Sequence, residues 1–382
     1  MRRSLLDTFT DVYIMDLHGN SNKRESSPDG SKDENVFDIK QGVAIGVFIK
    51  TSPTTDPRLV NKADLWGIRE AKYSCLAQTD VASTRWAPLK PQPEQYFFKS
   101  APTVQEGTFQ HHVKITEAFV IHCEGVMTSR DHFAIDMDKS TIVQRLEEMR
   151  DPRTTGSEIR TKHGIPDTRD WHLDQARALL AADNEWKEDI VKILHLPYDP
   201  RWTHHSQAVM DWPRLRVLRN MRSQNIALLT TRQTKDDFGA LATTAIARHK
   251  AAPRYDKTFV FPLYVYPETG TREERQRSFR EGSHWPPGQG GRRPNLDVSS
   301  VERMAHRLGL QFVPDGMGDL QSTFGPEDFF CYVYATLHSP GYRQRYADFL
   351  KIDFPQVPLT SDRKLFRALV EKGRELVSLH LL

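Results

Sequence analysis

The sequence has little cysteine and no long hydrophobic run. Cys75, Cys123 and Cys331 are the three cysteines among 382 residues. Because their number is odd and they lie far apart, they form neither a disulfide framework nor the paired spacing of a zinc site. No apolar run approaches the roughly 20 residues that a membrane helix needs. No cleavable signal precedes the first amphipathic stretch. These absences favour a protein of the reducing cytoplasm.

Motifs of several catalytic classes are also missing. No phosphate-binding loop of the Gly-x-x-x-x-Gly-Lys-Ser/Thr type is present. No glycine-rich turn follows a strand-like run. His204 and His205 lie close to Asp211, but neighbouring side chains of a strand point to opposite faces. We therefore expect no metal site.

Charge is balanced overall but unevenly distributed. The formal net charge is only +3. Between residues 201 and 254, ten Lys or Arg residues face three Asp. This cluster includes Arg214, Arg216, Arg219 and Arg222, and a second cluster lies between residues 272 and 293. Such clustering is typical of contact with phosphate groups, although a solvated helix face has the same composition.

The hydrophobic pattern predicts an α+β protein. Short apolar runs at 12–17 and 43–49 predict two strands buried in a sheet, separated by a polar loop. Further strands are expected at 226–230 and 258–266. Helices are expected at 138–150, 171–182, 327–338 and 342–351, followed by a C-terminal helix with Thr360 or Ser361 as its N-cap.

The order of several short motifs carries a family resemblance. The first is Tyr13-Ile-Met-Asp-Leu-His-Gly-Asn20, which is followed by the long motif at 33–50. The others lie at residues 86–89, 96–98, 128–136, 167–171, 196–202, 210–214, 230–233, 260–267, 293–296, 334–346 and 349–355. Together they resemble the C-terminal part of type ISP restriction–modification enzymes, in which an N6-adenine DNA methyltransferase precedes a target-recognition domain.

This resemblance implies a domain plan. Residues 1–55 would be the C-terminal remnant of the methyltransferase domain, with the terminal strands of its α/β sheet. Residues 56–330 would be a mixed α+β target-recognition domain, and residues 331–382 a C-terminal helical segment. The chain would begin after the cofactor-binding and catalytic motifs of the family, which we expect upstream of Met1.

The resemblance also suggests roles for Phe48, Thr128 and Arg130. Phe48 lies where related adenine methyltransferases stack an aromatic ring on a flipped base, although it could be ordinary strand core. Thr128 and Arg130 lie in the turn that opens the recognition domain and could contact DNA phosphates. Ser129 replaces a second glycine that many relatives have there. A solvated turn is the alternative.

Two further segments are the best candidates for contact with bases. They contain Arg201 with Trp202 and Arg232 with Gln233. Arg can pair bidentately with guanine and Gln with adenine in the major groove. Contact with the sugar–phosphate backbone or a structural role remains open for each. Arg214, Arg219 and Arg222 are expected to contact the backbone.

The cofactor and partners follow from the same resemblance. The intact enzyme would use S-adenosylmethionine, but the polar-Pro-Pro-aromatic tetrapeptide that holds the adenine amino group is absent; Pro286-Pro287 has the wrong neighbours. We therefore expect no cofactor and no catalytic residue in this chain, and leave its enzymatic activity open. Double-stranded DNA is the expected partner, with a separate catalytic methyltransferase or translocase chain as another. The alternatives are a general nucleic-acid-binding protein and a non-functional remnant.

Overall fold

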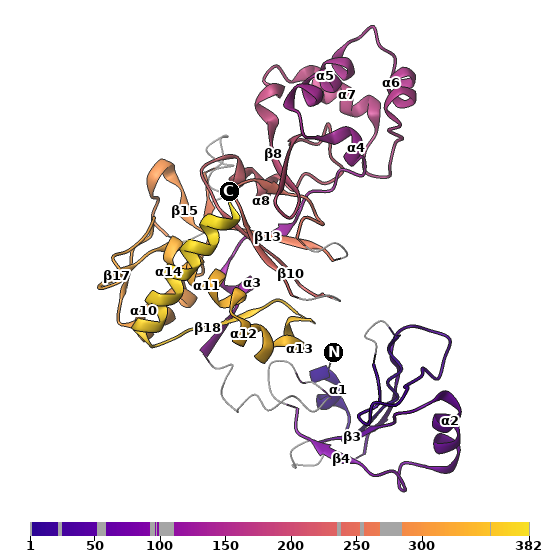
Figure 1. Ribbon diagram of the computed structural model, residues 1–382. Coiled ribbons are helices and arrows are strands. Elements are labelled where there is room, and N and C mark those ends of the chain that lie inside the picture. The colour runs from indigo at the N-terminus through magenta and orange to yellow at the C-terminus, as the bar shows by residue number, and fades with distance from the viewer. Residues whose placement is uncertain are drawn as a thin grey trace. The chain divides into compact units, whose positions relative to one another are not determined.

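The computed structural model forms two compact units, Met1–Glu106 and Gly107–Leu382 (Figure 1). It describes residues 2–21, 25–51, 59–91, 96, 98, 111–234, 238–252, 256–267, 285–351 and 353–381. No helix in these ranges is long and apolar enough to cross a membrane.

The first unit is built on a sheet with the strand order β2-β1-β3-β4. Its elements are α1 (Arg2–Thr8), β1 (Asp11–Asp16), β2 (Ala44–Ile49), β3 (Val60–Asp64), α2 (Arg69–Gln78) and β4 (Ala87–Leu89). Strand β1 pairs antiparallel with β2 and parallel with β3. The two predicted strands are therefore confirmed, and a small core of Leu6, Val12 and Val60 lies beneath them.

The burial predicted for the second strand is wrong. Ile45 and Ile49 of β2 are 42% and 38% exposed. Strand β2 lies at the edge of the sheet, so one side lacks a strand neighbour. An apolar run alone cannot distinguish such an edge strand from a central one.

A buried ion pair fixes the loop between β1 and β2. Lys72 of α2 and Asp33 of the loop are both fully buried, and their charged atoms lie 2.7 Å apart. Lys72 Nζ also donates to the carbonyls of Leu17 and Glu34 at 2.7 and 2.6 Å. Asp33 accepts hydrogen bonds from the backbone N–H groups of the glycines at 19 and 67. Because both charges have partners, the pair holds the loop to α2.

The second unit contains several small sheets and a larger number of helices. Its first elements are β5 (His112–Lys114), α3 (Ile115–Ala118), β6 (Cys123–Glu124), α4 (Asp131–Ala134), β7 (Ile135–Asp136), α5 (Lys139–Arg150), α6 (Gly156–His163), α7 (Leu173–Ala182), η3 (Trp186–Asp189), β8 (Ile190–Leu196), β9 (Asp199–His204), α8 (Leu215–Leu218) and η4 (Arg219–Arg222). They are followed by β10 (Ala227–Thr231), β11 (Ala240–Thr243), β12 (Ile246–Ala247), β13 (Thr258–Pro262), β14 (Tyr264–Val265), η5 (Gln289–Gly291), β15 (Arg293–Pro294), α10 (Val298–Leu308), β16 (Gln311–Phe312), β17 (Thr323–Phe324), α11 (Pro326–His338), α12 (Pro340–Arg345), α13 (Ala347–Leu350), β18 (Gln356–Pro358) and α14 (Arg363–His380).

Two four-stranded sheets organise this unit. One has the order β11-β10-β13-β6, and the other has the order β12-β8-β9-β7. Helices α5, α6 and α7 cluster together at the top of the view (Figure 1). A single hydrophobic core joins α5 and α7 to strands of both sheets, through residues such as Leu146, Leu180, Ile193 and Leu229. The α+β class predicted from the sequence is thus confirmed.

The C-terminal helices α11 and α14 run side by side (Figure 1). Gly373 makes this close approach possible, because a Cβ atom there would collide with the Cys331 carbonyl. The N-cap of α14 is Asp362, whose carboxylate accepts hydrogen bonds from the N–H groups of Lys364 and Leu365 at 2.8 and 3.1 Å. The predicted cap at Thr360 or Ser361 is therefore wrong by one or two residues.

The compact units do not follow the predicted domain plan. They meet between residues 106 and 107, because β3 and β4 follow residue 55 yet pair with the first sheet. The helices after residue 330 likewise pack within the second unit. The boundaries at 55 and 330 divide the chain by function and stay predictions.

Candidate nucleic-acid interface

Strand β10 presents two long polar side chains at its end. All five of its residues are buried, and it pairs antiparallel with β11 on one side and β13 on the other. Directly after it, Arg232 is 62% exposed, and Gln233 is exposed as well. Arg232 forms an ion pair with Asp353, with 3.6 Å between Nε and Oδ1. Two exposed hydrogen-bonding groups therefore follow directly on a buried strand, an arrangement suited to contact with bases.

Further cations lie at the same edge of this sheet. Thr231 pairs with Thr258, so Lys257 lies beside the end of β10. Lys257 is 61% exposed, and its Nζ lies 2.8 Å from Glu124 Oε1. Arg214 contacts the other oxygen of the same carboxylate at 3.5 Å. One carboxylate thus serves two cations at this edge, and the exposed ammonium group of Lys257 is of the kind that contacts a phosphate backbone.

Arg130 and Thr128 have a structural environment instead. Arg130 is only 2% exposed, and its guanidinium donates to Asp211 Oδ1 at 2.6 Å and to the Val209 carbonyl at 3.0 Å. The guanidinium also lies 3.7 Å from the centre of the Trp171 ring. Burial lowers the pKa of Arg130, and Asp211 opposes this effect. Thr128 is buried and donates its hydroxyl to Asp131. In this arrangement neither side chain has exposed surface for DNA, which corrects the expected phosphate contact.

Arg201 and Trp202 lie on β9. The Arg201 guanidinium is held by Asp199 at 2.9 Å. Trp202 is flanked by two lysines that the sequence reasoning missed: Lys192 Nζ lies 4.1 Å and Lys139 Nζ 5.0 Å from the ring centre. Both lysines are exposed, and no carboxylate within the described ranges pairs with either. Lys192 is the cross-strand partner of Trp202, so a strand register could have indicated this cluster.

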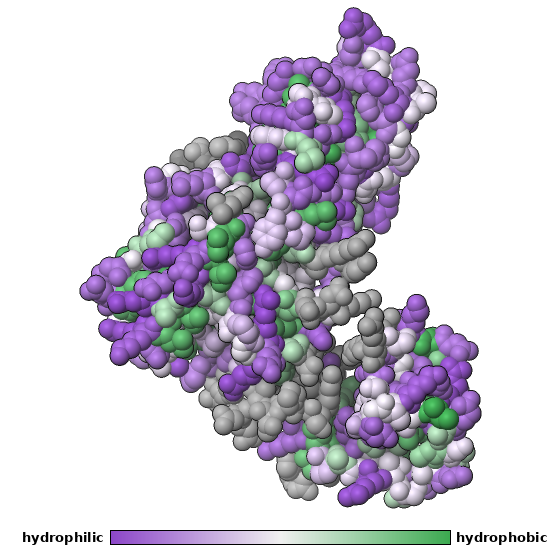
Figure 2. All heavy atoms as spheres, viewed as in Figure 1, coloured by the Kyte–Doolittle hydropathy of each residue, from purple (hydrophilic) through white to green (hydrophobic). Residues whose placement is uncertain are grey.

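The surface around α5, α6 and α7 is mainly hydrophilic (Figure 2). Lys139, the first residue of α5, belongs to this part of the chain. Such a surface is suited to solvent or a charged ligand rather than an apolar partner.

The dense arginine cluster is largely engaged in local contacts. Arg222 forms an ion pair with Asp189 at 2.5 Å and donates to the Glu188 carbonyl at 3.2 Å. Arg219 approaches the Tyr266 carbonyl at 3.5 Å. Of the second cluster, the arginines at 272, 275, 277 and 280 lie outside the described residues. Arg292 is buried, pairs with Asp315 at 2.8 Å and stacks on Tyr264. Composition alone therefore overstated the free positive charge.

Phe48 lies on the edge strand β2 and is 36% exposed. Its ring packs against Phe9, with 5.3 Å between ring centres. It also covers Gly46, where a Cβ atom would lie 2.7 Å from the ring. The ring is therefore held by its neighbours while part of it faces solvent, so the role in stacking on a base stays a prediction.

Two groups of residues contain side chains of the kinds that bind metal ions. His204 and His205 are buried; His204 Nδ1 contacts the Ser206 hydroxyl, and His205 donates to the Pro213 carbonyl. Asp16, His18 and Asp64 bring their ligand atoms within 4.8 Å of one another. Lys62 Nζ already lies 2.6 Å from Asp64 Oδ1, and His18 Nε2 lies 2.9 Å from the same oxygen. The ammonium group of Lys62 therefore already occupies the place beside Asp64 that a metal ion would take.

Comparison with known families identifies this arrangement. The model of the type ISP C-terminal specificity domain matches residues 117–382. The chain belongs to this family. None of the curated proteins is significantly similar to the chain in sequence.

Solved structures share the fold of this type ISP chain. One is the type ISP restriction–modification enzyme LlaBIII bound to DNA, with a TM-score of 0.60 and 20% identity. A DrdV–DNA complex gives a TM-score of 0.58 at 19% identity, and a nuclease-deletion mutant of the type ISP enzyme LlaGI with a DNA substrate mimic gives 0.55 at 19%. Each match covers 100% of this chain but only 24%, 36% and 28%, respectively, of the LlaBIII, DrdV and LlaGI chains. The chain thus spans about a quarter to a third of the length of these proteins.

Proposed function

We propose that this chain recognises a specific sequence in double-stranded DNA. It would act as the specificity part of an N6-adenine-specific DNA methyltransferase in a restriction–modification system. Family membership supports this proposal, as do the DNA complexes formed by proteins of the same fold. The observation that carries it is the exposure of Arg232 and Gln233 at the end of the buried strand β10.

The chemistry of these two side chains matches the edges of bases. A guanidinium donates two parallel hydrogen bonds to O6 and N7 of guanine, and a carboxamide can both donate to and accept from adenine. The cations around them, Lys257 and Arg214, would meet the phosphates on either side. The buried strand would fix the register of these contacts, because its own hydrogen bonds to β11 and β13 prevent it from shifting.

Base flipping and methyl transfer belong, in this proposal, to the intact enzyme. Phe48 would stack on the extruded adenine. S-adenosylmethionine would bind elsewhere, because the residues of this chain supply neither the glycine-rich turn nor the polar-Pro-Pro-aromatic motif that the cofactor and the target base require. We expect calorimetry with the isolated chain to detect no binding of S-adenosylmethionine, and a micromolar dissociation constant would contradict this assignment.

The catalytic motifs would come from a partner chain or from another part of a longer protein. The exposed apolar residues of β2, Ile45 and Ile49, are consistent with further catalytic sheet packing there. The neighbouring upstream reading frame distinguishes the possibilities, since a split enzyme requires the missing motifs nearby.

Selection from randomised duplexes tests the proposal. A sequence-reading protein should enrich one short site, and its affinity for that site should fall steeply with salt as counterions are released. The second candidate is a general nucleic-acid-binding protein, which the clustered basic residues favour. That protein would show the same dependence on salt but would enrich no site.

A further inference from the structure

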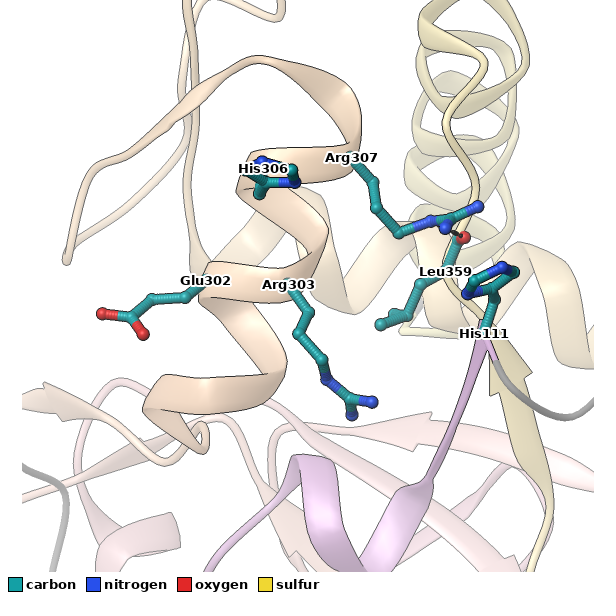
Figure 3. A pocket seen from close by; sticks show the side chains of 6 residues that line it. All are labelled: His111, Glu302, Arg303, His306, Arg307 and Leu359. Carbon is teal, nitrogen blue, oxygen red and sulfur yellow. Dashed lines mark hydrogen bonds between the residues drawn. The ribbon is translucent and has the colours of Figure 1, made fainter.

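A second cationic site lies on helix α10, far from β10 in the sequence. A pocket of about 400 Å³ is lined by His111, Glu302, Arg303, His306, Arg307 and Leu359 (Figure 3). Val301, Met304 and Leu308 bury the opposite face of the same helix. The amphipathic pattern of α10 therefore fixes which of its side chains face the pocket.

The wall of the pocket is rigid. Strand β5 pairs with β18, and the Leu359 N–H extends this pairing by donating to the His111 carbonyl at 2.6 Å. The Leu359 carbonyl in turn accepts a hydrogen bond from Arg307 Nε at 2.7 Å, which Figure 3 shows as a dashed line. In the part of the chain that the structure describes, Nε is the only guanidinium nitrogen of Arg307 that forms such a hydrogen bond. The Nη groups remain to donate hydrogen bonds from a guanidinium that is already oriented.

The charges of the pocket do not cancel. Arg303 is exposed and lies one helical turn before Arg307. Arg307 extends toward Leu359 and His111, and Arg303 extends from the same side of the helix below them, whereas Glu302, which also lines the pocket, points to the other side (Figure 3). Within the described part of the chain, no carboxylate forms an ion pair with either arginine. Two guanidinium groups and the imidazole of His111 therefore line one concave space.

We propose that this pocket binds a phosphate group. Guanidinium groups bind phosphate through paired hydrogen bonds, and a phosphate has enough oxygens and charge to engage two of them at once. A single carboxylate would leave one arginine without a partner. The cavity lies at the lower end of the size range of ligand sites, so it has room for a phosphate group or a small phosphate ester. The phosphate could come from the backbone of a nucleic acid or from a free ester.

Calorimetric titration of the full chain with inorganic phosphate, at constant ionic strength, tests this site. Arg303→Ala should weaken the affinity for phosphate by at least about tenfold, the loss expected for a charge-assisted hydrogen bond. Arg303→Glu should abolish binding. Because Arg303 is exposed, neither change is expected to disturb folding. Arg153→Ala is the matched control: it removes the same charge from a side chain that is 89% exposed, and it should bind phosphate like the wild type.

Affinity for duplex DNA then distinguishes the two sources. If the pocket holds a backbone phosphate, Arg303→Ala should weaken binding to all sequences alike and reduce the salt slope by about one. If it holds a free ester, the affinity for DNA should stay unchanged while phosphate binding is lost. The proposal would be overturned if wild type and Arg303→Ala bound phosphate with equal affinity. It would also be overturned if the wild type bound no measurable phosphate and Arg303→Ala left the affinity for DNA unchanged. The phosphate titration does not require DNA recognition, so the two proposals can fail separately.

Discussion

Arg130 and Arg232 are the same residue type with the same expected partner, yet the structure places them in opposite environments. Arg130 is 2% exposed and bonded to Asp211, whereas the Arg232 side chain is 62% exposed with one weak ion pair. The buried arginine ties its turn to Val209 and Asp211, and the exposed one is available to a ligand. An arginine in a suitable motif therefore indicates DNA contact only when its guanidinium reaches the surface.

The largest expected effect is a loss of folding stability when the buried Arg130 is replaced. Arg130→Met removes one partner of a buried pair and leaves Asp211 without compensation. We expect the free energy of unfolding to fall by about 3–5 kcal/mol, measured by urea denaturation. Arg232→Ala should change it by less than about 0.5 kcal/mol. The double variant Arg130→Met with Asp211→Leu should recover much of the loss. If Arg130→Met and Arg232→Ala were equally stable, the distinction between a buried and an exposed arginine would be wrong.

The second effect is a dependence of folding stability on pH that comes from a buried histidine. His205 is fully buried, and burial lowers its pKa to about 4. Between pH 4 and the ordinary value of about 6.5, the unfolded chain binds the additional proton. The stabilisation is therefore complete above pH 6.5 and is lost as the pH falls toward 4, by about 3 kcal/mol.

Denaturation at a series of pH values measures this loss. His205→Gln should reduce the dependence on pH, whereas Arg232→Ala should retain the slope of the wild type. A wild-type stability that does not change between pH 6.5 and 4 would show that His205 is not held neutral.

The third effect lies on the exposed side. Arg232→Ala should cost about 1–3 kcal/mol of affinity on the best DNA site, because it removes a bidentate contact with one base. Fluorescence anisotropy gives the dissociation constants. Arg219→Ala, which has a local backbone contact through the Tyr266 carbonyl, should lower affinity evenly across sequences. A larger loss on the best site for Arg219→Ala than for Arg232→Ala would reverse the assignment.

The smallest effect concerns the lysines beside Trp202. Lys139→Ala and Lys192→Ala should each weaken binding by less than about 1 kcal/mol, as expected of exposed charges. Each should reduce the slope of affinity against salt by about one if it contacts a phosphate. An unchanged slope in both variants would assign the lysines to packing against the indole ring alone.

The sequence predicted the environment of the exposed Arg232 better than that of the buried Arg130. The strand expected at 226–230 is visible in the sequence, so the exposure of Arg232 and Gln233 just after it could be expected. Arg130 is buried because Asp211 lies 81 residues later in the chain, and no local pattern reports such a partner. The fully buried Lys72 was missed for the same reason, since its partner Asp33 lies in a polar loop. Local strands and helices follow from periodicity, whereas buried charges depend on tertiary pairing.

The most direct measurement compares the base preferences of wild type, Arg232→Ala and Lys192→Ala after selection from the same randomised duplexes. We predict that the wild type enriches one site, that Arg232→Ala loses preference at one position of that site, and that Lys192→Ala keeps every preference while binding more weakly. If Arg232→Ala retained the full preference of the wild type, the exposed end of β10 would not be the element that distinguishes one DNA sequence from another.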